Sequence, residues 1–109
     1  MAKVVLKKAA STRTTTYDVA ELLRTPEEMA AYLDAWLDEA PDDAAGIARA
    51  LGDIARAKGM SQVAKDAGVS RESLYRALSA EGNPSLATVL KVARALGVRL
   101  HAQAVTGGA

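Results

Sequence analysis

Residues 60–78 read MSQVAKDAGVSRESLYRAL, and this stretch decides the fold. About two turns of helix fit before Gly68, a residue that adopts a tight or left-handed turn at little cost. Ser70 can then cap a second helix by accepting a hydrogen bond from a backbone N–H two or three residues further on. Ala64 is small where the two helices must cross, and Leu74 faces it from the second helix. The stretch therefore predicts two short helices joined by a tight turn, which is a helix-turn-helix.

The second of these helices places polar side chains on its outward face. A helix of this diameter fits the major groove of DNA, where Arg bonds guanine and Glu accepts from cytosine. Ser hydroxyls and a helix N-terminus suit phosphates. The alternative is a helical bundle with an ordinary polar surface, in which Glu72 and Arg76 form an i, i+4 pair. We favour DNA binding, and the predicted contact residues are Ser61, Gln62, Lys65, Ser70, Arg71, Glu72, Ser73, Tyr75, Arg76, Asn83 and Ser85.

Two longer helices are predicted upstream, after a very short one that Asp18 can cap. Thr25 is placed to cap the first of them, with Pro26 at its first position. The second begins near Asp42 or Asp43 and ends at Gly59. Apolar residues recur at three- and four-residue steps, which predicts an inward stripe on each helix. These stripes are Met29, Tyr32, Leu33, Trp36, Leu37 and Ala40, and then Ile47, Leu51, Ile54 and Ala55.

Downstream, Ser85 can cap a last helix that Gly97 ends, with Leu86, Val89, Leu90, Ala93 and Leu96 predicted to face inward. Residues 98–105, VRLHAQAV, alternate apolar and polar side chains, which predicts a short strand. The fold class is thus all-α with a short C-terminal strand. The predicted parts are a basic N-terminal arm (1–16), in which KVVLK allows a short strand, an acidic helical extension (17–41), the helix-turn-helix domain (42–97), and the strand and tail (98–109).

Composition and charge narrow the function classes. The chain has 109 residues, no cysteine and four aromatic residues, so disulfides and thiolate metal sites are excluded. The apolar run Val4-Val5-Leu6 is too short for a secretory or membrane segment, and we expect a soluble, cytoplasmic protein.

Residues 17–43 carry nine acidic side chains against Arg24 alone, whereas the segments on either side are net basic. Such a chain can offer its basic part to a polyanion and its acidic part to a basic partner. The alternative is that both charged parts are ordinary solvated helix faces.

No pattern in the sequence predicts catalysis. His101 is the only histidine, and there is no Ser-His-Asp order, phosphate-binding glycine loop or paired-carboxylate motif. The helix dipole explains the adjacent acidic pairs at helix starts. We therefore expect no enzyme activity, no metal site and no cofactor.

Residues 46–97 resemble a lambda-repressor-like (Xre-type) helix-turn-helix domain of five helices. More narrowly, YDVAELLRTPEEMAAYLDAWLDEA followed by ALGDIARAKGMSQVAKDAGVSRESLYRALSAEGNPSLATVLKVARALGVRL is similar to the addiction-module antidote proteins. These are HigA-like antitoxins of type II toxin–antitoxin pairs, and the resemblance covers residues 17–100. It implies a chain that binds a RelE/HigB-like mRNA-cleaving ribonuclease toxin, a small basic protein, and represses its own operon.

The resemblance also assigns roles to single residues. Arg71, Glu72, Ser73 and Arg76 fall where the superfamily reads bases, and Asn83 and Ser85 precede the last helix where backbone contacts occur. Many members carry Thr-Gln four or five residues before the alanine of the first motif helix. Here Gln62 lies only two residues before Ala64, so the phosphate contact carries over to Gln62 or Ser61 only weakly.

Three expectations about partners follow. We expect the toxin to contact the acidic extension, and the predicted residues are Tyr17, Asp18, Glu21, Glu28, Tyr32, Trp36 and Glu39. For Tyr32 and Trp36 the alternative is packing onto the helix-turn-helix domain. We also expect a homodimer on operator DNA, joined through the last helix or the 98–105 strand, because one recognition helix reads only a few base pairs. The alternative function is a stand-alone transcriptional regulator without a toxin.

Overall fold

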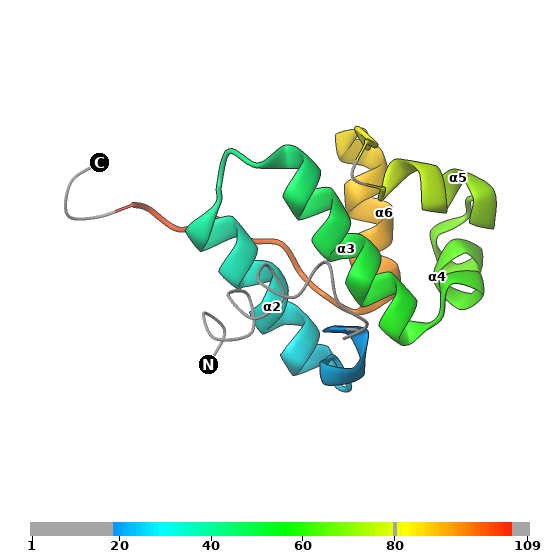
Figure 1. Ribbon diagram of the computed structural model, residues 1–109, viewed down its shortest axis with the longest axis horizontal. Helices are drawn as coiled ribbons and strands as arrows, with labels where there is room; N and C mark the ends of the chain where they lie inside the picture. The colour runs from blue at the N-terminus through cyan, green and yellow to red at the C-terminus, as the bar shows by residue number, and fades with distance from the viewer. Residues whose placement is uncertain (1–18, 80, 106–109) are drawn as a thin grey trace.

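The computed structural model describes residues 19–79 and 81–105 as a bundle of short helices (Figure 1). A single-turn 3-10 helix, η1 (Val19–Leu22), leads into α2 (Pro26–Glu39) and α3 (Ala44–Lys58). The chain then forms α4 (Met60–Ala67), α5 (Arg71–Ala77) and α6 (Leu86–Leu96). The predicted order of helices is confirmed. The basic arm (1–16), which contains KVVLK, lies outside the described residues, and so do Tyr17 and Asp18 of the acidic extension.

The predicted C-terminal strand is wrong for the single chain. Residues 98–105 have no regular secondary structure, and no strand occurs within residues 19–79 and 81–105. A strand needs a second strand to accept and donate its backbone hydrogen bonds, and the described chain supplies none. The alternating pattern therefore has no partner strand among residues 19–79 and 81–105.

The helix ends follow the residues predicted to set them. Thr25 accepts from the backbone N–H of Glu28, whose carboxylate in turn accepts from the Thr25 N–H, a capping box that starts α2. Asp43 caps α3 through the N–H of Gly46 at 2.8 Å. Gly97, at φ 78°, ends α6 in the left-handed conformation that glycine adopts most easily.

The core runs through every helix, and α3 lies at its centre. Ala50, Leu51, Ile54 and Ala55 of α3 are 0–2% exposed, and α3 packs against η1, α2, α4 and α6. The acidic extension belongs to this core, because α2 contributes Met29, Tyr32, Leu33, Ala35 and Trp36 to the same cluster. Gly46 is buried beneath the Trp36 ring, where a Cβ atom would collide with the ring.

The predicted inward stripes are correct for most positions and wrong for three leucines. Leu37 is 43% exposed, and Leu86 and Leu90 of α6 are 71% and 50% exposed. On α6 the buried side chains are Val92, Ala93, Ala95 and Leu96, so the buried face is rotated from the predicted one. Apolar residues occupy most of the circumference of α6, and the spacing alone did not identify the face that meets α4.

A half-buried hydrogen bond joins α2 to α3. The Tyr32 hydroxyl donates to Asp53 Oδ2 at 2.8 Å, and Arg56 donates to Asp53 Oδ1 at 3.3 Å. Burial raises the pKa of the Tyr32 phenol, and the nearby Trp36 side chain offsets only part of this rise. The Trp36 Nε1 atom is itself buried without a partner at hydrogen-bond geometry. Burial also raises the pKa of the Asp53 carboxyl, against the lowering effect of the Tyr32 hydroxyl and of Arg56.

We predict that Tyr32→Phe lowers the free energy of unfolding by about 1–2 kcal/mol at pH 7, because the half-buried Asp53 carboxylate loses one of its two donors. A carboxyl whose folded pKa is raised contributes stability below its unfolded pKa and loses that contribution as pH rises through the folded pKa. The Tyr32 hydroxyl reduces this loss by stabilising the ionised form, so the variant's deficit should shrink toward pH 4. Urea unfolding at both pH values measures it, with Tyr75→Phe, at an exposed tyrosine, as the control. An equal deficit at both pH values would contradict the role assigned to the ionised carboxylate.

Candidate nucleic-acid interface

Helices α4 and α5 are joined by a turn of residues 68–70, and together they form the α4–α5 unit. Gly68 adopts φ 74° and ψ 31°, the left-handed region. Its N–H donates to Lys65 O at 3.2 Å, and the Val69 N–H donates to Ala64 O at 3.0 Å, which satisfies the last carbonyls of α4. Ser70 then accepts from the Ser73 N–H at 3.0 Å and starts α5. The turn is therefore built by local hydrogen bonds and one positive φ.

The outward face of α5 is polar and accessible. Leu74 is 1% exposed and holds α5 against the core, whereas Arg71, Glu72, Tyr75 and Arg76 are exposed. The Arg71 guanidinium lies over the Tyr75 ring, 5.5 Å from its centroid. This stacking restrains a long side chain while its N–H donors stay in solvent. Within the described residues no ion pair joins Glu72 to Arg76, so the i, i+4 pair that belonged to the alternative of an ordinary polar surface does not form.

The remaining predicted DNA residues are also exposed, but several have structural hydrogen bonds. Ser61, Gln62 and Lys65 lie on α4, and the Gln62 amide donates to Asp66 Oδ1 at 2.9 Å. Ser85 caps α6 by accepting from the Thr88 N–H at 3.1 Å, and Asn83 lies in the preceding loop. Nine of the eleven residues thus belong to the α4–α5 unit, and Asn83 and Ser85 come from the loop before α6. The i, i+4 spacing of Gln62 and Asp66 on α4 is the local signal for this hydrogen bond, which the DNA-binding prediction did not use.

The described residues of the predicted toxin-binding set fall into two groups, those that are buried or used in the fold and those that are exposed. Tyr32 and Trp36 are 1% and 6% exposed, which agrees with the alternative that they pack into the fold, and neither offers surface to a partner in this arrangement. Glu28 closes the capping box, and its hydrogen bond to Arg24 lowers the pKa of that carboxyl. Glu21 and Glu39 are exposed.

The outer face of α2 carries further acidic residues that the predicted toxin set omits. The helix has five acidic residues and no basic one, and Asp34, Leu37 and Asp38 are exposed on it. These three side chains line a hollow whose other wall is residues 98–105. In Figure 1 α2 and the α4–α5 unit lie on opposite sides of α3, so the acidic face of α2 is separated in space from Lys65, Arg71 and Arg76.

Metal chemistry and membrane insertion find no support in the described part of the chain. Residues 19–79 and 81–105 contain no group of three or more His, Cys, Asp or Glu side chains placed to hold a metal ion, and His101 is exposed on the C-terminal segment. No helix among these residues is both long enough and apolar enough to cross a membrane.

Comparison with known proteins identifies the family. A family model described as "Probable addiction module antidote protein" matches residues 13–104. The chain belongs to this antidote family. A protein of Haemophilus influenzae (strain ATCC 51907 / DSM 11121 / KW20 / Rd), described only as "Uncharacterized protein", is 54% identical over 87 residues, which cover 80% of the antidote chain and 88% of that relative. No solved structure matches the antidote. Membership in the family implies a toxin as the partner of the antidote.

We predict that Gly68→Ala destabilises the antidote by about 1–2 kcal/mol, the cost of a Cβ atom in the left-handed region. No atom lies within 4 Å of the position such a Cβ would occupy, so the loss should be purely conformational. Gly68→Asn is the matched variant, because Asn tolerates this conformation better and should recover part of the loss. Thermal unfolding of both variants measures the difference. Equal losses for Ala and Asn would contradict a conformational cause.

Proposed function

We propose that this antidote is a type II antitoxin of the HigA-like class that neutralises a RelE/HigB-like mRNA-cleaving ribonuclease and represses its own operon. The observation that carries the proposal is the exposed face of α5, with Arg71 stacked on Tyr75, on an element separate from the acidic α2. One chain can then hold a basic protein and a polyanion at the same time.

The α4–α5 unit is proposed as a helix-turn-helix of the lambda-repressor-like, Xre type. A helix placed in the major groove reads bases with the first residues of its outward face. Arg71 and Arg76 supply guanidinium donors for guanine, and Glu72 supplies an acceptor for cytosine. Lys65 on α4 and Ser73 on α5 are exposed, and we assign them to the phosphates that flank these bases. A second copy would place its own recognition helix about 34 Å away, or a multiple of it, on a pseudo-palindromic operator.

The acidic face of α2 is proposed as the toxin-binding surface. A ribonuclease that binds mRNA needs a basic surface, and opposite fields speed the association of two proteins and disfavour wrong partners. Asp34 and Asp38 are exposed beside Leu37, so a charged contact can surround an apolar one. The stand-alone regulator remains the second candidate, and it would leave this surface without a partner. Membership in the antidote family favours the antitoxin.

For DNA we predict that Arg71→Ala weakens binding to the chain's own promoter by about 1–3 kcal/mol and relaxes specificity at one base position. Fluorescence anisotropy with promoter duplex and with random duplex measures both affinities. Arg24→Ala is the control, since this arginine is exposed beside Glu28 near the start of α2. Equal weakening on both duplexes would show that Arg71 reads no base.

For the toxin we predict that the double reversal Asp34→Lys/Asp38→Lys weakens binding of the toxin from the adjacent reading frame by tenfold or more and leaves promoter binding intact. The reason is the loss of charge complementarity at exposed positions that contribute nothing to the core. Deleting α2 would be uninformative, because Leu33 and Trp36 belong to the core.

The matched control for the toxin experiment is Asp66→Lys/Glu81→Lys, which makes the same change in net charge at exposed positions outside α2. Toxin affinity should stay unchanged in this variant when it is measured by calorimetry. If both double variants weaken toxin binding equally, net charge is responsible and α2 is not the contact.

A further inference from the structure

The Arg71 side chain rests on an aromatic ring of its own helix. Its guanidinium carbon lies 5.5 Å from the centroid of the Tyr75 ring, which comes one helical turn later on α5. The Tyr75 side chain is 48% exposed, so the ring does not fill the core. Its neighbour Leu74 is 1% exposed and does belong to the core, where it fixes which face of α5 points outward. Tyr75 therefore makes its contact on the surface of the protein, with Arg71.

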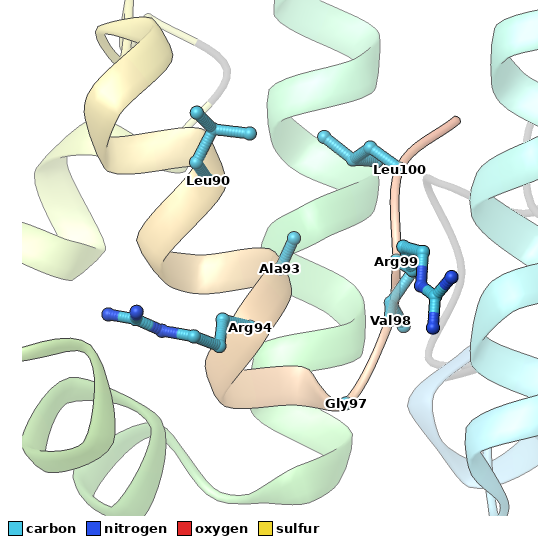
Figure 2. A pocket seen from close by; sticks show the side chains of 7 residues that line it. All are labelled: Leu90, Ala93, Arg94, Gly97, Val98, Arg99 and Leu100. Carbon is cyan, nitrogen blue, oxygen red and sulfur yellow. The ribbon is translucent and has the colours of Figure 1, made fainter. Parts of the chain in front are cut away.

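This support is specific to Arg71. Arg76 is exposed on the same helix, but no ring contact involves it within the described part of the chain. Arg94 and Arg99 offer a second comparison, because Figure 2 shows them in a groove whose other side chains carry no aromatic ring. Tyr75 thus restrains the arginine at the first position of α5 and leaves these other arginines unsupported.

The hydrogen-bond donors of Arg71 stay available while the ring holds it. No ion pair or hydrogen bond involves its side chain among residues 19–79 and 81–105. A guanidinium is planar, so stacking on a ring uses its face, and its N–H groups point outward in its plane. These N–H groups are the ones that bond guanine O6 and N7. A contact with Tyr75 and a contact with a base can therefore exist together.

Pre-ordering matters because a long side chain loses rotamer freedom when it binds. Immobilising such a side chain weakens binding, and a contact that already orders it in the free protein reduces this cost. A residue that acts in this way contributes only while the side chain that it orders is present. A tyrosine that touched the DNA itself would contribute with or without Arg71.

We propose that Tyr75 is a positioning residue for Arg71, whose ring pre-orients the guanidinium for one guanine and whose hydroxyl is dispensable. This role differs from the direct DNA contact that the sequence predicted for Tyr75. It makes position 75 a determinant of sequence specificity although its side chain reads no base. The inference rests on the proposed function, because it takes operator DNA as the partner of α5.

Two substitutions separate the ring of Tyr75 from its hydroxyl. Tyr75→Phe keeps the ring, whereas Tyr75→Leu keeps an apolar side chain that suits a helix and removes the ring. Each is made in the wild-type chain and in the Arg71→Ala chain, which gives a double-mutant cycle. Fluorescence anisotropy measures binding to promoter duplex, to promoter duplexes with single base changes and to random duplex. Circular dichroism shows whether each variant keeps its helices and its melting temperature.

Tyr75→Leu should weaken promoter binding about three- to tenfold, the range expected for ordering one long side chain. In the Arg71→Ala chain the same substitution should cost less than about twofold, the limit within which independent changes add. Tyr75→Phe should bind as the wild type does. Tyr75→Leu and Arg71→Ala should relax specificity at the same base position. The salt dependence of binding should be unchanged by Tyr75→Leu, because no phosphate contact is lost.

Nuclear magnetic relaxation of the arginine Nε–H groups tests the restraint in the free protein. The Arg71 group should be more ordered than the Arg76 group in the wild type and in Tyr75→Phe, and the two should be alike in Tyr75→Leu. Equal order of the two arginines in the wild type overturns the proposal, because Tyr75 would then restrain nothing.

Two binding results would also overturn the positioning role. Equal losses from Tyr75→Leu with and without Arg71 would show that the two residues act separately. A Tyr75→Phe protein as weak as Tyr75→Leu would show that the hydroxyl makes the contact. Both results leave the proposed repressor function standing as long as the wild type prefers its promoter. A wild type that binds promoter and random duplex equally refutes that function and this inference together.

Discussion

The packing of α3 is the interaction on which the rest of the structure depends. Its side chains Ala50, Leu51, Ile54 and Ala55 are nearly inaccessible, and η1, α2, α4 and α6 all contact this helix. By contrast, α5 has only seven residues, and a helix this short is not stable by itself in water. It is held by Leu74, by the Ser70 cap and by α4, which in turn packs on α3 and α6. The presentation of Arg71 and Arg76 thus depends on Leu74, which holds α5 against the same core that has α3 at its centre.

The sequence predicts the helices well, because their ends are set by local chemistry. Thr25, Ser70 and Ser85 each accept a hydrogen bond from the N–H three residues on, and Gly68 and Gly97 take up positive φ. Each of these helix ends depends on only a few neighbouring residues, so the local sequence is enough to predict it.

What the sequence does not predict depends on contacts between distant residues. The face of α6 that is buried is set by its packing against α3 and α4, which leaves Leu86 and Leu90 exposed. Apolar residues surround most of this helix, so their spacing in the sequence does not show which face is buried. The Tyr32–Asp53 hydrogen bond joins residues that are 21 positions apart in the sequence, and no local pattern predicts it. For the candidate site, the exposure of α5 was predictable from its polar face. Arg71 and Tyr75, like Gln62 and Asp66, lie four residues apart on one helix, so their spacing allows both contacts, and the structure shows that they form. The alternation of residues 98–105 predicts a strand, and the part of the chain that the structure describes holds no second strand to pair with it.

In the proposed function, α2 and the α4–α5 unit are two independent binding surfaces on one core. Hydrogen–deuterium exchange of the intact chain tests this most directly, measured alone, with the toxin, with operator duplex and with both together. The account predicts that the duplex slows exchange in α5 and the turn at residues 68–70, that the toxin slows exchange in α2, and that both protections appear together in the ternary mixture. Protection of α5 by the toxin, or displacement of the toxin by the duplex, would contradict it.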